Sequence, residues 1–207
     1  MELLEGIATL KKYGINVVPT LLTRDLGEAK KIGTKLGFPL AIKIISPDIL
    51  HKSDRGCVKL NISNVEELGK AWKGIMANAK GARIEGMLIQ KMASKGIELI
   101  VGGKVDEQFG PLVLFGLGGI YVEILKDFSM RVCPISKEDA LEMISEIKGL
   151  PILQGARGTK PVDLNAVADL LVKVSRLLSE SKIKELDLNP VIAYEKGYVV
   201  VDVRMIE

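Results

Sequence analysis

The spacing of apolar residues along the chain changes repeatedly between the 3.6-residue period of helices and the two-residue alternation of strands. A helical period predicts helices over 2–13, 26–36, 65–79, 137–147 and 164–178. Alternating or continuous aliphatic runs predict strands over 17–22, 40–45, 57–62, 84–92, 97–105, 112–115, 130–135, 186–194 and 198–203. Because adjacent strand pairs alternate with helices, we expect an α+β chain with mixed or antiparallel sheets flanked by helices.

Local signals mark the ends of several of these elements. Thr23 and Ser136 stand where a helix N-cap is expected, and Ser63 with Glu66 reads as a capping box. The turn Glu195-Lys196-Gly197 joins the last two strands, which predicts a hairpin with Asp202 on its returning strand.

Composition narrows the class of protein. The 207 residues carry 29 Lys+Arg against 26 Asp+Glu, a net charge of +3, with 47% hydrophobic but only 4% aromatic residues. Such a balance does not favour nucleic-acid binding, which uses basic patches and stacking aromatics. The longest uncharged run is too short and too rich in glycine for a membrane helix, and the N-terminus does not read as a signal peptide. We expect a soluble cytoplasmic protein whose Cys57 and Cys133 are buried free thiols.

Two positions in the first half of the chain are candidates for phosphate chemistry. Lys43 lies in the middle of an aliphatic strand, where it either points to solvent or holds a phosphate as a point charge. A polar loop follows, in which the sole histidine, His51, precedes Arg55 and Gly56. Such a loop can approach phosphates through backbone amides, although a lone histidine is more often a surface or core residue.

The C-terminal hairpin is a candidate metal site. Asp187 and Asn189 alternate with leucines and so face one side of their strand. A hairpin can bring Asp202 close to them, and hard oxygen ligands of this kind suit Mg²⁺ that bridges nucleotide phosphates. The alternative is a polar row that faces solvent.

The order of several motifs resembles a known family. The chain is similar to the ATP-grasp β subunit of ADP-forming acyl-CoA synthetases, such as acetate–CoA ligase, which is related to the β chain of succinyl-CoA synthetase. The matching segments run through nearly the whole chain: Ala41–Ile44, His51–Asp54, Leu88–Met92, Gly96–Gly102, Gln108–Pro111, Phe115–Ile120 with Glu123, Gly155–Gly158, and Glu185–Pro190 with Asp202.

The resemblance implies an ATP-grasp fold, in which two α+β lobes grip ATP between their sheets. It implies a single domain over 1–207, with lobes near 15–92 and 93–207 and the helix of 1–14 packing on the fold.

The resemblance also implies the roles of individual residues. By this likeness Lys43 binds nucleotide phosphate, and Asn189 and Asp202 hold Mg²⁺. The remaining nucleotide contacts implied are the adenine hinge Gln90-Lys91-Met92 and a ribose-side carboxylate at Glu98.

His51 matches the phosphoryl-carrying histidine of this family, and Asp187 matches the acid that orients a phosphorylated histidine. Neutral imidazole is nucleophilic near pH 7 and can accept a phosphoryl group without a strong base. The family usually has a second glycine where Cys57 follows Gly56, so we assign phosphate contact to Arg55 and Gly56 but not to Cys57.

The function implied is the nucleotide-binding subunit of an acid–thiol ligase that catalyses acyl-CoA + ADP + Pi ⇌ acid + ATP + CoA. Its partner would be a CoA-binding α subunit in a hetero-oligomer, since nothing in this chain resembles a CoA-binding domain. Two alternatives stay open: a regulatory or assembly subunit that binds nucleotide without turnover, and another ATP-grasp ligase that uses an acyl phosphate without a histidine relay.

Overall fold

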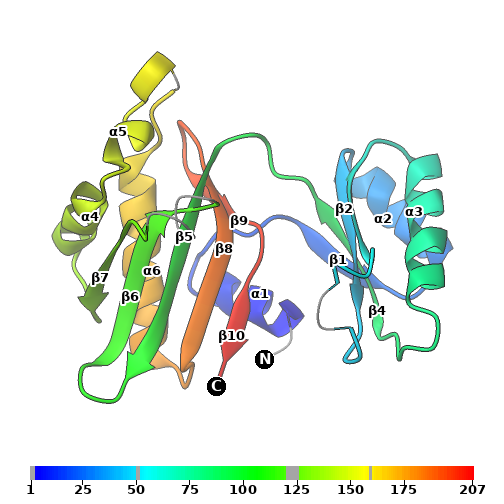
Figure 1. Cartoon of the computed structure of the whole chain (residues 1–207), viewed down its shortest axis with the longest axis horizontal. Coiled ribbons are helices and arrows are strands. Elements are labelled where there is room, and N and C mark those ends of the chain that lie inside the picture. Colours follow the sequence, from blue (N-terminus) through cyan, green and yellow to red (C-terminus); the bar gives the residue numbers. More distant parts are fainter. Residues whose placement is uncertain (1–2, 50–51, 120–125, 159) are drawn as a thin grey trace. The chain divides into compact units, whose positions relative to one another are not determined.

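The computed structural model describes residues 3–49, 52–119, 126–158 and 160–207. The chain divides into two compact units, Val18–Ser94 and a second made of Met1–Val17 with Lys95–Glu207. Both units are built from an antiparallel sheet and helices (Figure 1), so the expected α+β class is confirmed.

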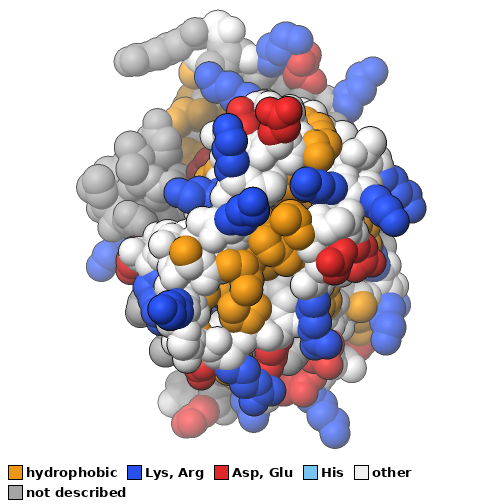
Figure 2. All heavy atoms as spheres, turned by 90° about the vertical axis from the view of Figure 1, so that its right-hand side faces the viewer, with side chains coloured by type: hydrophobic (Ala, Val, Ile, Leu, Met, Phe, Trp, Pro, Cys, Tyr) orange, Lys and Arg blue, Asp and Glu red, His pale blue; other side chains and the backbone are white. Residues whose placement is uncertain are grey.

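The unit Val18–Ser94 has a four-stranded sheet in the order β1–β4–β2–β3. Its elements, in chain order, are β1 (Thr20–Thr23), α2 (Leu26–Leu36), β2 (Leu40–Ile45), β3 (Val58–Ile62), α3 (Val65–Asn78) and β4 (Gly86–Lys91). Alternate residues of the central strands, such as Ile42, Ile44 and Ile89, pack with Leu68 and Trp72 of α3 in one core. On the helical side of this unit, which faces the viewer in Figure 2, charged side chains of both signs surround a small group of hydrophobic ones.

The caps of this unit's two helices correct the sequence prediction by one or two residues. Helix α2 begins after Asp25, whose carboxylate accepts from the Glu28 amide, and not after Thr23. Helix α3 begins after Asn64, whose side chain accepts from the Glu67 amide. Ser63 lies one residue before this cap. The periodic pattern does not distinguish among neighbouring capping residues, so the ends of the helices shift while their interiors do not.

The second unit has a six-stranded sheet, with five strands in the order β10–β8–β5–β6–β7 and β9 paired to β8. Its strands are β5 (Ile97–Asp106), β6 (Gly110–Leu117), β7 (Phe128–Val132), β8 (Glu185–Ala193), β9 (Tyr198–Val200) and β10 (Arg204–Ile206). Its helices are α1 (Leu3–Lys12), α4 (Lys137–Glu146), α5 (Leu150–Leu153), the 3₁₀ turn η2 (Ala156–Gly158) and α6 (Leu164–Glu180). Ser136 caps α4 in a capping box with Asp139, so that predicted cap is confirmed.

One face of this sheet carries the core. Helix α6 lies along this face (Figure 1). Leu99, Val101 and Phe115 of the sheet share one core with Leu171 and Val174 of α6. Because successive side chains of a strand point to opposite faces, the intervening residues form the other face of the sheet. The side chains on this second face, which we call the open face, include all the sequence-predicted candidates of the C-terminal hairpin.

The last part of the chain differs from the predicted hairpin. Strand β9 ends at Val200, and residues 201–203 form a break before a further strand, β10. Asp202 therefore lies between two short strands and not on a single returning strand. Both short strands pair antiparallel with β8.

Two further predictions concern cysteines and membrane helices. Cys57 and Cys133 are both buried and free, so the expectation of buried free thiols is confirmed. Within the described ranges, none of the helices has the length and apolar character needed to cross a bilayer.

Candidate functional site

The open face of the large sheet is arranged in rows that run across all its strands. The pairing register places Met130, Leu114, Gly102, Asp187 and Arg204 side by side on β7, β6, β5, β8 and β10. Apolar residues occupy the β6–β7 end of this row and charged residues occupy the β8–β10 end. The row therefore joins an apolar surface to an ionic one.

The neighbouring row brings the two predicted metal ligands together. Val191 pairs with Val200, and Asp187 pairs with Arg204, in a single register on either side of the break. The same register, continued across 201–203, puts Asp202 directly opposite Asn189. The Val201 amide donates to the Pro190 carbonyl at 3.0 Å, which keeps the two segments adjacent within the break.

The Asp202 carboxylate also has a local contact, since it accepts from the Val203 amide at 3.0 Å. Asn189 lies where β5 and β8 shift register, between the pairs Leu99–Val191 and Val101–Leu188. Irregularities of this kind change the direction of a side chain relative to a regular strand. The described residues contain no group of three or more His, Cys, Asp or Glu arranged to hold a metal ion, and Asn189 with Asp202 provides one amide and one carboxylate oxygen donor.

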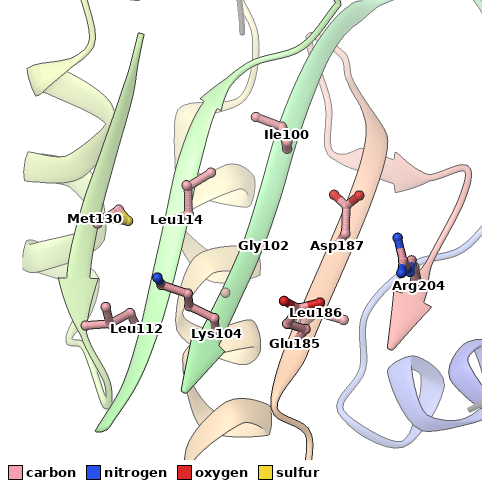
Figure 3. Close-up of a pocket in the computed structure, with 11 residues that line it drawn as sticks. Ile100, Gly102, Lys104, Leu112, Leu114, Met130, Glu185, Leu186, Asp187 and Arg204 are labelled. Carbon is pink, nitrogen blue, oxygen red and sulfur yellow. The ribbon is translucent and has the colours of Figure 1, made fainter. Parts of the chain in front are cut away.

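Asp187 lines a hollow of about 280 Å³ on the open face (Figure 3). Although its side chain reaches solvent, the walls of the hollow partly desolvate it and thereby raise the pKa of Asp187. The guanidinium of Arg204 lowers that pKa and the carboxylate of Asp202 raises it, so both neighbouring charges act on Asp187. The sequence-predicted residues Asp187, Asn189 and Asp202 are thus brought to one face of one unit.

Glu98 lies on the same unit, near the start of β5, beside two glycines. Its carbonyl accepts from the Gly118 amide at 2.7 Å. A side chain at Gly118 would approach the Glu98 backbone to 3.0 Å, and Gly119 has a positive φ of 63°. Because Gly118 and Gly119 have no side chains, the segment that contains them can pass close to the Glu98 backbone. The exposed carboxylate of Glu98 stays at the surface of the sheet.

On the unit Val18–Ser94, Lys43 occupies the face of the sheet that is opposite the helices. Its neighbours Ile42 and Ile44 point into the core, so the half-buried Lys43 points the other way, between Val58 of β3 and Leu88 of β4. The aliphatic walls shield the stem of the lysine, as expected for a long charged side chain that crosses an apolar surface.

The predicted hinge residues have their own bonding partners. Gln90 is 3% exposed and donates from Nε2 to Thr20 Oγ1 at 3.0 Å. The Lys91 ammonium donates to the carbonyls of Gly37 and Phe38 at 2.9 and 2.8 Å.

The backbone amides of the hinge are also engaged. The amide of Lys91 donates to Pro19 O at 2.9 Å, and that of Met92 donates to Pro39 O at 3.1 Å. An adenine base held here by a backbone donor would therefore need an amide other than these two.

The loop before β3 is held at its C-terminal end. Gly56 has a φ of 62°, its amide donates to Ser53 O at 2.9 Å, and its carbonyl accepts from Asn78 Nδ2 at 3.0 Å. The positive φ of Gly56 favours glycine, and a side chain at this position would also displace Asn78 Nδ2, which it would approach to 2.7 Å. Arg55 is exposed, and Cys57 is buried. His51 lies outside the described residues, and so does Glu123.

Comparison with protein families gives the fold a name. A family model described as an ATP-grasp domain matches residues 2–206. The chain belongs to the ATP-grasp family. The resemblance that the sequence motifs indicated is thereby confirmed at the level of the family.

Two curated relatives of this ATP-grasp chain are described as ADP-forming acetate–CoA ligases. The "Acetate--CoA ligase [ADP-forming] I subunit beta" of Pyrococcus furiosus is 54% identical over 207 residues, covering 98% of this chain and 89% of the relative. "Acetate--CoA ligase [ADP-forming] I" of Archaeoglobus fulgidus is 50% identical, and the match again covers 98% of this chain. The chain spans only 30% of the length of that longer relative.

A solved structure extends the comparison. It is the acetyl-coenzyme A synthetase 1 of Ca. Korarchaeum cryptofilum "in complex with coenzyme A and Mg-AMPPCP, phosphohistidine segment pointing towards nucleotide binding site". It superposes with a TM-score of 0.90 at 44% identity and covers 100% of this ATP-grasp chain and 92% of that chain.

Sequence reasoning missed two residues of the open face. Gly102 interrupts an aliphatic strand, and a mid-strand glycine often marks a bulge or the close approach of a ligand or another backbone. Arg204 follows Asp202 at a spacing of two, which would put both on one face of a continuous strand. Neither signal is specific without the register that the structure provides.

Proposed function

We propose that this chain is the nucleotide-binding β subunit of an ADP-forming acyl-CoA synthetase. In that role it transfers a phosphoryl group between a phosphohistidine and ADP, within the reaction acyl-CoA + ADP + Pi ⇌ acid + ATP + CoA. The observation that carries the proposal is the common register of β9 and β10 on β8, which puts Asp202 opposite Asn189 on the open face, in a chain 54% identical to a β subunit of this class.

The donor set suits a nucleotide-linked magnesium ion. Mg²⁺ is typically held by one or two protein oxygens together with water and substrate phosphates, and here it would screen the charge of the phosphoryl group in transfer. Asn189 and Asp202 provide two oxygen donors on adjacent segments, and Asp187 adds a second carboxylate nearby.

Other residues are proposed to bind the nucleotide. Lys43, shielded by aliphatic neighbours, provides a point charge for a phosphate. Arg55 and Gly56 are proposed to contact phosphate. Glu98 is proposed to accept from ribose hydroxyls, and the segment Gln90-Lys91-Met92 to border the adenine.

His51 is the proposed phosphoryl carrier. Its imidazole takes the phosphoryl group on one ring nitrogen, and the Asp187 carboxylate is proposed to orient a phosphorylated histidine by accepting from the other nitrogen. We further propose a CoA-binding α partner, which makes the acyl phosphate, and a cytoplasmic location.

The experiment that tests this function is phosphoryl labelling of the full-length chain. The chain is mixed with a CoA-binding α subunit of a related synthetase, Mg²⁺ and ATP labelled at the γ-phosphate. Acid-labile label on this chain, discharged by added ADP, is the expected result. Nucleotide binding without label would favour a regulatory subunit, and turnover without label would favour a ligase that uses an acyl phosphate directly.

Replacement of Asp202 by asparagine should weaken the binding of the metal–nucleotide complex. The change removes one negative charge, while the amide oxygen can still accept from the Val203 amide, so the fold should persist. Because charge count sets the affinity for hard cations, the apparent Kd for Mg²⁺ in the presence of ADP should rise at least about tenfold. Calorimetric titration of Mg²⁺ measures this value.

A matched control is Asp169→Asn. Asp169 forms an exposed ion pair with Lys137 on the same unit, at 2.9 Å, and such surface pairs contribute little. Its replacement should leave the magnesium titration unchanged. Equal affinities for Asp202→Asn and the wild-type chain would remove Asp202 from the metal site.

A further inference from the structure

Gly102 is one of the residues that line the hollow on the open face. Gly102 lies between Leu114 and Asp187 in the row that crosses the sheet, and it alone among these three has no side chain (Figure 3). A Cβ at Gly102 would come within 2.7 Å of the Leu186 carbonyl oxygen. The floor beside it is aliphatic, formed by Ile100, Leu112, Leu114 and Met130.

Arg204 stands at the charged end of this hollow. It pairs with Asp187 in the β8–β10 ladder, and both line the hollow from the same side (Figure 3). Among the described residues, Arg204 makes no ion pair within 4.0 Å, unlike Arg131 and Arg176, which each hold a glutamate. Its guanidinium therefore retains its donors for a further anion.

The position of Arg204 relative to the proposed metal ligands is set by the strands. Asp187 and Asn189 lie two residues apart on β8, and residues so spaced are about 7 Å apart on the same face. Arg204 and Asp202 stand opposite these two residues. An anion between the two rows would thus contact the metal ligands on one side and the guanidinium on the other.

We propose that Arg204 binds the phosphoryl group while it passes between the histidine and the nucleotide. This proposal rests on the proposed function and adds a residue that the sequence motifs did not assign. A guanidinium presents several donors in a fixed plane that matches two phosphoryl oxygens, whereas a lysine presents a single point charge. Cations that contact the equatorial oxygens stabilise the transition state of phosphoryl transfer.

In the direction of ATP synthesis, a β-phosphate oxygen of ADP attacks phosphorus, the new O–P bond forms, and the P–N bond to the imidazole breaks. The bonding electron pair returns to the ring nitrogen. The proton that the other ring nitrogen already carries stays in place, so the released imidazole is neutral. Arg204 donates to the transferring oxygens throughout and exchanges no proton.

The test separates transfer from nucleotide binding. The complex of the full-length chain with the α partner is labelled from ATP, freed of nucleotide and then mixed with ADP in a rapid-quench device. For Arg204→Ala, discharge of the label should be slower by about a hundredfold. Arg204→Lys should recover part of the rate. ADP affinity, measured by calorimetry, should stay within about threefold of wild type because Arg204 contacts the group in transit.

The control variant is Lys184→Ala. Lys184 is an exposed residue immediately before β8 that does not line the hollow, so its loss removes the same charge from the same sheet and should leave the discharge rate unchanged. Arg204→Gln provides the measurement if the alanine variant does not fold.

Discharge at the wild-type rate in Arg204→Ala and Arg204→Gln would overturn the proposal. An equal loss of rate and ADP affinity would do so as well. Failure of the wild-type complex to take up label would instead overturn the proposed function.

Discussion

His51→Ala should abolish the acid-labile phosphoryl label on this chain while leaving ADP binding in place. The chain contains a single histidine, so this one substitution removes every imidazole that could carry a phosphoryl group. The proposed nucleotide contacts at Lys43, Asn189 and Asp202 are untouched, which separates binding from transfer. Filter-bound radioactivity before and after acid treatment, with calorimetry of ADP, measures the two quantities.

His51→Asn is the companion variant. It keeps a polar side chain that can donate and accept, but it has no nucleophilic ring nitrogen. It should behave like the alanine variant in labelling. Persistent acid-labile label on either variant would place the phosphoryl carrier elsewhere and remove the basis of the relay.

Gly103→Ala should be strongly destabilising. A Cβ at Gly103 would overlap the Leu112 carbonyl oxygen of β6 and the Leu178 methyl group of α6. The side chain of Leu178 can adjust, but the carbonyl belongs to the β5–β6 ladder and cannot move without loss of pairing. Overpacking of this kind costs about 1–3 kcal/mol or more, which lowers Tm by about 2–4 °C per kcal/mol in a chain of this size. Thermal unfolding followed by circular dichroism gives the shift.

Gly74→Ala is the control for that prediction. Gly74 lies inside α3, and a Cβ there would meet no atom within 4 Å. Alanine restricts the unfolded chain and suits a helix, so this variant should gain about 0.5–1 kcal/mol. If both variants shifted Tm in the same direction, the steric explanation for Gly103 would be wrong.

The sequence predicted the parts of the site that lie within one regular element. In β8 the leucines at 186 and 188 are buried and the polar residues at 187 and 189 are exposed, as alternation requires. The same holds for Lys43, whose neighbours Ile42 and Ile44 are in the core. A two-residue period is a local property, and burial of one face is enough to fix it.

The parts that depend on contacts between elements were not predictable. Asp202 was expected on a returning strand, but the strand breaks and resumes as β10, and only the register against β8 shows which residue it faces. The resemblance implies Gln90-Lys91-Met92 as the adenine hinge, but it does not indicate that the amides of Lys91 and Met92 donate to the carbonyls of Pro19 and Pro39. Those carbonyls lie more than fifty residues away along the chain, so no local pattern could indicate them.

The break at 201–203 has a consequence for how this protein can vary. Strands β9 and β10 pair with β8 in one continuous register, so the segment between them must contain three residues. A substitution within the break leaves the number of residues between β9 and β10 unchanged. Insertion or deletion of one residue would turn the side chain of Arg204 to the opposite face of the sheet. At Val201 and Val203 the segment should therefore tolerate changes of sequence over evolutionary time, whereas its length and the metal-ligand position Asp202 should stay constant.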